Sequence, residues 1–309
     1  MQRSQHLSTV RRTYKPTWWN EKTLTVVLFL APTMLLLGLY VVYPIIDAFR
    51  LSFFRWNGLS AELTSVGWEN WRRLAADTIF WRALRNNLIV VGLSIAIQIP
   101  TGLGLAVLLE QGRKLPLLRV FKTIYFFPML MSSVAIGILF KYIFDPVFGL
   151  VNQLLELVRI PPQSWLGDSR LALITVIIVI SWQFIPFYMM LFVAALTSIP
   201  VELRDAARLD GATNSKYYRY IAIPLVSGTI RTAVILALIG SLKYFDLIWV
   251  MTEGGPNHAS ELMATYMYKK AFPSFEVGYG STVAGALFVL VMLLSLAALR
   301  FTRRYETEV

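Results

Sequence analysis

The feature that most constrains this chain is a series of long runs with few or no charged residues. A helix needs about 20 apolar residues to cross the hydrocarbon core of a bilayer. Six segments approach or exceed that length, although the fifth contains Lys243 and Asp246. These segments are 24–46, 88–109, 123–140, 171–201, 232–251 and 277–299. We therefore predict an all-α membrane protein with six transmembrane helices, and we expect the first segment to be a retained helix rather than a cleaved signal peptide.

The composition supports this fold class and excludes several functions. The chain is 56% hydrophobic and 15% charged, whereas soluble domains average about 25% charged residues. It contains no Cys, and its two histidines, His6 and His258, are far apart in the sequence. We therefore expect no disulfide framework, no metal site, no catalytic residue and no enzyme activity on this chain. The net charge of +11 is better explained by membrane topology than by nucleic-acid binding.

The distribution of basic residues predicts the orientation. With six spans, both termini lie on the same side of the membrane. If that side is the cytoplasm, sixteen Lys and Arg residues fall in inner segments and ten in outer loops, as the positive-inside rule favours. We therefore expect a basic cytoplasmic tail over 1–23, a membrane domain over 24–309, and outer loops at 47–86, 145–170 and 252–276, the first of which carries a short surface helix around 67–74.

One inner segment, 198–224, is unusually well ordered for a connection between spans. Pro200 suits the first turn of a helix, Gly211 suits a left-handed cap at its end, and Asn214 suits the N-cap of a second short helix. Acidic side chains near the first turn favour the positive end of the helix dipole. One face combines small and polar residues, namely Leu203, Ala206, Ala207 and Asp210. From the residues alone, a surface connector and a docking site remain equally open.

The same segment resembles the "EAA loop" of permease subunits in binding-protein-dependent ABC importers. The resemblance rests on Asp205-Ala206-Ala207, then Gly211, then Ile221-x-Ile223-Pro224, with Asp in place of the usual Glu and Ile in place of Leu. Other motifs are similar to the sugar-importer branch of the maltose and glycerol-phosphate type. These are Phe121 through Pro128, Phe144-Asp145-Pro146-x-x-Gly149-x-x-Asn152, Thr252-x-Gly254-Gly255-Pro256, Tyr266-x-Tyr268-x-x-Ala271-Phe272 and Gly278-Tyr279-Gly280-Ser281.

The resemblance implies a type I importer permease fold, also called MetI-like, in a bacterial or archaeal cytoplasmic (inner) membrane. It implies a second permease subunit, expected to be a different chain, and two cytoplasmic ABC ATPase subunits that bind ATP and Mg. It also implies an extracytoplasmic sugar-binding protein. The residues that it assigns to ATPase coupling are Glu202, Asp205, Ala206, Ala207, Asp210, Gly211, Ile221 and Pro224.

Polar and aromatic residues inside the spans are candidates for contact with a sugar. Buried polar groups in membranes are costly and often functional, and aromatic faces cover the apolar side of a sugar ring. The candidates are Trp182, Gln183, Tyr188, Tyr244 and Asp246. For any single residue, helix packing is an equal alternative.

Lys243 and Asp246 are three residues apart, so one continuous helix would let them form an ion pair. An ion-coupled secondary transporter that titrates Asp246 is the alternative function, although the halves show no inverted repeat. A structural or assembly role for the membrane protein would leave the ordered inner segment unexplained.

Overall fold

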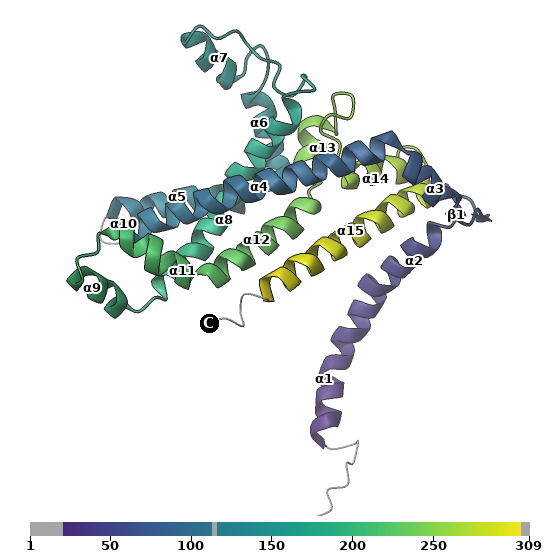
Figure 1. The fold of residues 1–309 in the computed structure, drawn as a ribbon. Coiled ribbons are helices and arrows are strands. Elements are labelled where there is room, and N and C mark those ends of the chain that lie inside the picture. Colours follow the sequence, from purple (N-terminus) through teal and green to yellow (C-terminus); the bar gives the residue numbers. More distant parts are fainter. Residues whose placement is uncertain (1–20, 113–115, 304–309) are drawn as a thin grey trace, which may run out of the picture. The chain divides into compact units, whose positions relative to one another are not determined.

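The computed structural model describes residues 21–112 and 116–303, which are mainly helical (Figure 1). The chain forms two compact units, Met1–Ala48 and Phe49–Val309. The described part of the first unit is helix α1 (Glu21–Leu37), a π-helical turn η1 (Gly38–Val42) and the start of α2 (Tyr43–Leu51). Most of the basic tail that we expected over 1–23 lies outside the described residues.

The second unit begins with the end of α2 and a small antiparallel hairpin. Its strands are β1 (Phe54–Arg55) and β2 (Thr64–Ser65), with Phe54 opposite Ser65. Helix α3 (Glu69–Ala76) follows, and it confirms the short helix expected around 67–74.

Helix α4 (Thr78–Gln111) begins ten residues before the predicted span. Asp77 caps it by accepting hydrogen bonds from the backbone amides of Ile79 and Phe80 at 2.8 and 3.2 Å. The expected loop 47–86 is therefore wrong over its last nine residues. The apolar run did not reveal these turns because their buried polar residues, Asn86 and Asn87, contact protein rather than lipid.

Two of the predicted spans are broken. Helices α5 (Pro116–Leu130) and α6 (Ser133–Ile143) meet at 100°. The segment 214–225, which contains α10 (Asn214–Tyr217), the π-helical turn η2 (Tyr218–Ala222) and α11 (Ile223–Leu225), meets α12 (Ser227–Leu242) at 66°. The predicted span 232–251 begins after this second bend and is itself divided, because the backbone leaves the helix after α12 and resumes only in α13 (Asp246–Thr252).

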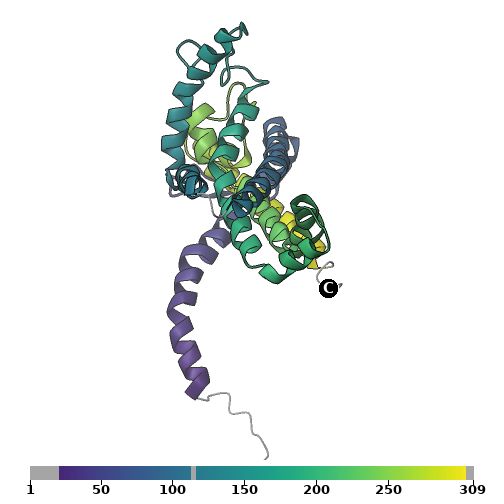
Figure 2. The same ribbon diagram turned by 90° about the vertical axis from the view of Figure 1, so that its left-hand side faces the viewer.

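The remaining helices complete the bundle. They are α7 (Leu150–Leu157), α8 (Ala172–Thr197), α9 (Val201–Leu209), α14 (Met263–Ala271) and α15 (Val277–Arg303). Helices α4 and α8 pack side by side, α12 packs on α4, and α15 packs on α12 (Figures 1 and 2). Within the described residues, four helices are long and apolar enough to cross a membrane, or six if each bent pair counts as one span, in agreement with the predicted fold class.

Helix α4 connects the two ends of this unit. Figure 1 shows the hairpin and α3 at one end of α4, and α9 with α10 at the other. We call these the α3 end and the α9 end. Between them, Gly102 brings α4 against α8, because a Cβ at this position would lie 2.9 Å from the Tyr188 Cβ and 3.0 Å from the Met189 amide nitrogen. Side chains of α4, α6, α8 and α13 form a shared core that includes Val90, Ile136, Ile180 and Ile248.

Candidate functional site

The segment that resembles the EAA loop forms a short helix with defined ends. Helix α9 begins after Pro200, which is its N-cap rather than a residue of the first turn. Gly211 has a φ of +77°, so the predicted left-handed cap is confirmed. The next helix, α10, is capped by Thr213 and not by Asn214, because the Thr213 hydroxyl accepts a hydrogen bond from the Lys216 amide.

Helix α9 presents an exposed face that differs from the predicted one. Leu209 is 90% exposed, and Glu202, Leu203, Asp205, Ala206 and Asp210 are also exposed. Ala207, in contrast, is only 6% exposed and belongs to a buried cluster with Tyr217 and Tyr218. We expected a small residue at this position to admit a partner. In the structure its small size lets α9 pack on its own chain. Farther along the segment, Ile221 is half-buried and Pro224 is exposed.

The inner face of α9 is tied to the end of α4 by a network that the sequence analysis missed. Arg204 Nη1 lies 2.8 Å from Glu110 Oε1, and the Tyr218 hydroxyl donates a hydrogen bond to Glu110 Oε2. We call these three residues the Glu110 network. A cavity of about 660 Å³ lies beside it, lined by residues of α4, α9 and the segment between α8 and α9. The sequence did contain one signal for this network. Glu110 is an acidic residue in the last turn of a long helix, where the helix dipole disfavours a negative charge.

The sugar-contact candidates in the middle of α8 lie between the break that separates α5 from α6 and the break that separates α12 from α13. Gln183 Nε2 donates to the Ser133 hydroxyl at 3.3 Å, just after the break between α5 and α6. Phe184 packs against Tyr244, which lies in the break between α12 and α13, with ring centroids 5.6 Å apart. Three sequence-distant segments therefore meet at the centre of α8.

The other candidates have different surroundings. The Trp182 ring packs edge-to-face on Phe140 at 5.1 Å, while Tyr188 is buried in the cluster that also contains Tyr217. Asp246 is exposed at the start of α13. The predicted ion pair between Lys243 and Asp246 is wrong, because the helix is interrupted between these residues and so does not place them on one face.

Two buried asparagines on α4 hold the α3 end of the bundle. Asn86 Nδ2 donates to the carbonyls of Ala259 and Glu261 at 3.0 and 2.9 Å. Asn87 donates to the Leu242 carbonyl at 3.3 Å and accepts from the Met263 amide at 2.9 Å. Since Leu242 is the last residue of α12, Asn87 binds a carbonyl that the break in the helix would otherwise leave unpaired.

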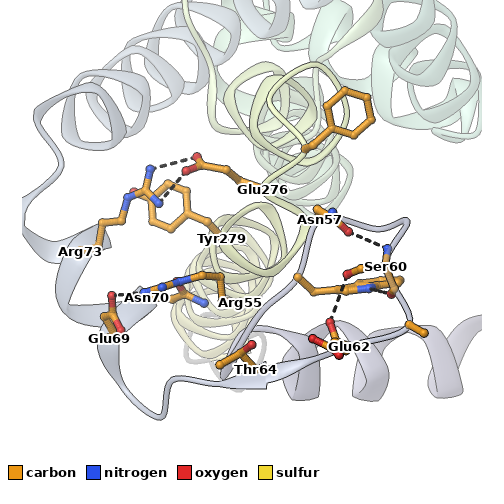
Figure 3. A pocket seen from close by; sticks show the side chains of 13 residues that line it. Arg55, Asn57, Ser60, Glu62, Thr64, Glu69, Asn70, Arg73, Glu276 and Tyr279 are labelled. Carbon is orange, nitrogen blue, oxygen red and sulfur yellow. Dashed lines mark hydrogen bonds and ion pairs between the residues drawn. The ribbon is translucent and has the colours of Figure 1, made fainter.

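A cavity of about 760 Å³ opens at the same end, between the hairpin, α3 and the start of α15 (Figure 3). Arg73 binds Glu276 with two hydrogen bonds of 2.9 Å each. The hydrogen bonds that Arg73 donates to Glu276 raise the pKa of Arg73. Burial alone would raise the pKa of Glu276, but its bonds with Arg73 outweigh that effect and lower the pKa. Asn57 and Arg55 add polar groups to the lining, so the cavity suits a hydrophilic ligand or a protein loop.

Asp77 fixes the start of α4 in the same region. In addition to its capping bonds, it accepts hydrogen bonds from the hydroxyls of Tyr266 and Tyr279, the latter at 2.5 Å. Burial by itself would raise the pKa of Asp77, but these hydrogen bonds outweigh it and the pKa is lowered. Burial and the bond to Asp77 raise the pKa of the Tyr266 hydroxyl. The three residues join α4, α14 and α15.

Comparison with known proteins identifies the family. Residues 98–305 match the family described as the binding-protein-dependent transport system inner membrane component. The chain belongs to this family. It is therefore a permease subunit of an ABC importer, and a transport subunit rather than an enzyme. The family assignment agrees with the predicted inner membrane location, and it favours the ATP-driven importer over the ion-coupled alternative.

Relatives extend over nearly the whole chain. The probable ABC transporter permease YurN of Bacillus subtilis is 35% identical over 94% of this chain and 99% of its own. The lactose transport system permease LacF of Rhizobium radiobacter is 32% identical, covering 93% and 94% of the two chains. The fold also matches a chain of a bacterial ABC transporter that imports the acidic polysaccharide alginate, with a TM-score of 0.82, 21% identity, and coverage of 92% of this chain and 96% of the other.

Proposed function

We propose that this chain moves a sugar or oligosaccharide, delivered by an extracytoplasmic binding protein, into the cytoplasm. The observation that carries the proposal is the full-length similarity to LacF, a permease of a lactose transport system. A permease for arabinooligosaccharides in Bacillus subtilis is 28% identical over 91% of this chain. These relatives transport carbohydrates of different sizes, so the proposal concerns the class of substrate rather than one sugar.

The coupling partner is a pair of cytoplasmic ABC ATPases, which bind ATP and Mg. The exposed face of α9, from Glu202 to Asp210, supports this role because it carries an apolar side chain, Leu209, at 90% exposure, while the same helix is held to its own chain through the buried Ala207. A second permease, expected to be a different chain, completes the membrane part. The docked ATPase shifts the balance between the two states of the permease only if it binds these states with different affinities.

The substrate path runs past the centre of α8. In secondary transporters, discontinuous helices next to polar side chains form the substrate site. In this chain, the break between α5 and α6 and the break between α12 and α13 both contact α8. The Ser181 hydroxyl and Gln183 Oε1 are buried without a hydrogen-bond partner among the described residues. They are available to sugar hydroxyls, while Trp182 and Tyr244 offer aromatic faces. Tyr188 and Asp246 extend the path toward the α9 end and toward α13.

In this proposal the α3 end faces outward and both termini are cytoplasmic. The polar cavity at that end then receives a loop of the binding protein, because its rim carries Arg55 and Arg73 beside Glu69 and Glu276. The orientation is tested in cells with single cysteines, which the chain does not otherwise contain. We expect Ser60→Cys to react with an impermeant maleimide from outside and Ser215→Cys to react only after permeabilisation. The reverse pattern contradicts the orientation.

The function is tested with the purified transporter. The chain is co-expressed with the products of neighbouring genes for a second permease, an ATPase and a binding protein, and reconstituted into liposomes. A panel of labelled mono- and oligosaccharides is offered to these liposomes. We expect uptake of a sugar from this panel, and we expect the uptake to require both ATP and the binding protein. Omission of either component is the control. Uptake that needs neither, but follows a sodium or proton gradient, contradicts the proposal and supports the ion-coupled alternative.

A further inference from the structure

The carboxylate of Glu110 lies where a helix normally avoids one. Glu110 is the penultimate residue of α4, and the negative end of the helix dipole disfavours an anion there. The side chain is nevertheless 12% exposed, and its partner Arg204 is 17% exposed. A buried carboxylate that loses its partner is strongly destabilised. The local preference at this helix end is therefore overridden by a contact with a residue 94 positions away.

The two oxygens of Glu110 bind two different elements. Oε1 binds Arg204 of α9, and Oε2 accepts from Tyr218 of η2. The Arg204 guanidinium also lies 5.6 Å from the ring centre of Tyr217 and 5.9 Å from that of Tyr218. Ala106, one turn earlier on α4, is fully buried in the same apolar cluster as Ala207. The end of α4 thus holds the inner face of α9, while the outer face of α9 stays open.

Helix α4 runs from the Glu110 network to the break between α12 and α13, which lies next to the proposed substrate path. Asn87, on the same helix, binds the last carbonyl of α12. The two positions are 23 residues apart, which is about 35 Å along a helix. Between them, α4 packs closely on α8 at Gly102. A displacement of α9 that moves Glu110 therefore also moves Asn87 if α4 behaves as one rigid element.

We propose that Glu110 and Arg204 are positioning residues that make α4 follow the coupling helix α9, so that a movement of the docked ATPase reaches the α3 end of the bundle. This inference rests on the proposed function. In this inference the Glu110 network transmits the movement and does not dock the ATPase, because its groups lie on the face of α9 that packs against α4.

The experiment uses the complete transporter in nanodiscs, with Ser274→Cys as the only cysteine in this chain. Ser274 is exposed near the α3 end, and its maleimide reaction rate is measured with and without Mg-ATP. Glu110→Gln and Arg204→Gln are compared with Lys216→Gln, an exposed residue of α10 whose loss changes the charge as Arg204→Gln does. The exchanged pair Glu110→Arg with Arg204→Glu tests whether the ion pair itself is needed.

We expect each single variant to retain its ATPase while the ATP-dependent change in labelling rate falls at least about threefold. We expect Lys216→Gln to match the wild type and the exchanged pair to recover part of the response. An unchanged response in both single variants overturns the inference, as does the absence of any ATP response in the wild type. Loss of the ATPase in the variants also overturns it, because the network then serves docking. If the wild type itself binds no ATPase, the proposed function fails instead.

Discussion

The two ends of α4 are held in different ways. At the α3 end, Asn86 and Asn87 make four hydrogen bonds of 3.3 Å or less to backbone groups at the end of α12, in the segment before α14 and at the start of α14. At the α9 end, one carboxylate, Glu110, serves as the acceptor for two side chains. Backbone groups have little freedom to move once they are bound, whereas the long side chain of Arg204 can follow its partner.

The difference indicates a division of roles along one helix. The α3 end is fixed by buried contacts with several segments, and the α9 end joins a helix whose opposite face is open. Two side chains can form their contact again at a new position. The buried contacts at the α3 end cannot, because moving them would leave the backbone groups at the interruption after α12 without hydrogen-bond partners. We therefore expect substitutions at the α3 end to affect stability, and substitutions at the α9 end to affect coupling.

Asn87→Leu gives the largest expected effect on stability. It leaves the Leu242 carbonyl and the Met263 amide without their partner, and an unsatisfied buried group costs about 1–3 kcal/mol. We expect a clear fall in the thermal unfolding midpoint in detergent and a lower yield of folded protein. Asn214→Leu, at an exposed position of α10, is the control. If Asn87→Leu and the control unfold at the same temperature, the α3 end is not the more rigid one.

Gly211→Val is expected to affect coupling more than global stability, because Gly211 is exposed and a change there stays local to the end of α9. A left-handed backbone costs a non-glycine residue about 1–2 kcal/mol, and a β-branched side chain fits it poorly. The end of α9 then changes its path, and we expect less ATPase to copurify at normal permease expression. Gly211→Asn is the matched control, since Asn tolerates this conformation and no atom lies within 4 Å of a Cβ there. Equal retention in both variants would make the segment a connector.

Trp182→Ala tests the region between the two ends. Its ring contacts Phe140 edge-to-face, so truncation removes some packing as well as a possible stacking surface. If the substrate path passes this position, uptake per assembled complex falls several-fold, in line with about 1 kcal/mol for an aromatic contact. Trp182→Phe keeps an aromatic ring and is expected to recover part of the uptake. A change only in the amount of folded complex would make Trp182 a packing residue.

The sequence predicted the features that depend on local pattern. The apolar runs located the spans, and Gly211 was recognised because only a small set of residues suits a left-handed cap. The start of α4 was not predicted, because Asn86 and Asn87 are polar and only their distant partners explain their burial. The interruption after α12 was also missed, since the residues between Leu242 and Asp246 include neither Gly nor Pro.

The candidate site was predicted as a segment but not as a face. The motif indicated where α9 lies, yet the period of the helix could not show whether Ala207 points outward, because that depends on the packing of Tyr217 and Tyr218 beneath it. Glu110 was missed for a similar reason. An acidic residue at the end of a long helix indicates that a partner is needed. The partner Arg204 is 94 residues away, however, and one sequence without an alignment does not show which residue it is.

The smallest expected effect concerns the charge that fixes the α3 end. Tyr266→Phe removes one hydroxyl donor from Asp77, which should cost about 1 kcal/mol at neutral pH. Since the pKa of Asp77 is lowered from 3.8 in the folded protein, its stabilising contribution is complete above that value. The contribution is lost as the pH falls through the lowered folded-state pKa. The difference in unfolding midpoint between the variant and the wild type should therefore be greatest near pH 7 and shrink at an acidic pH below 3.8. Tyr268→Phe, which removes a neighbouring hydroxyl on the same helix, is the control at both pH values. A difference that stays constant with pH would mean that the contribution of the Tyr266 hydroxyl does not depend on the charge of Asp77, and that this charge does not hold this end of α4.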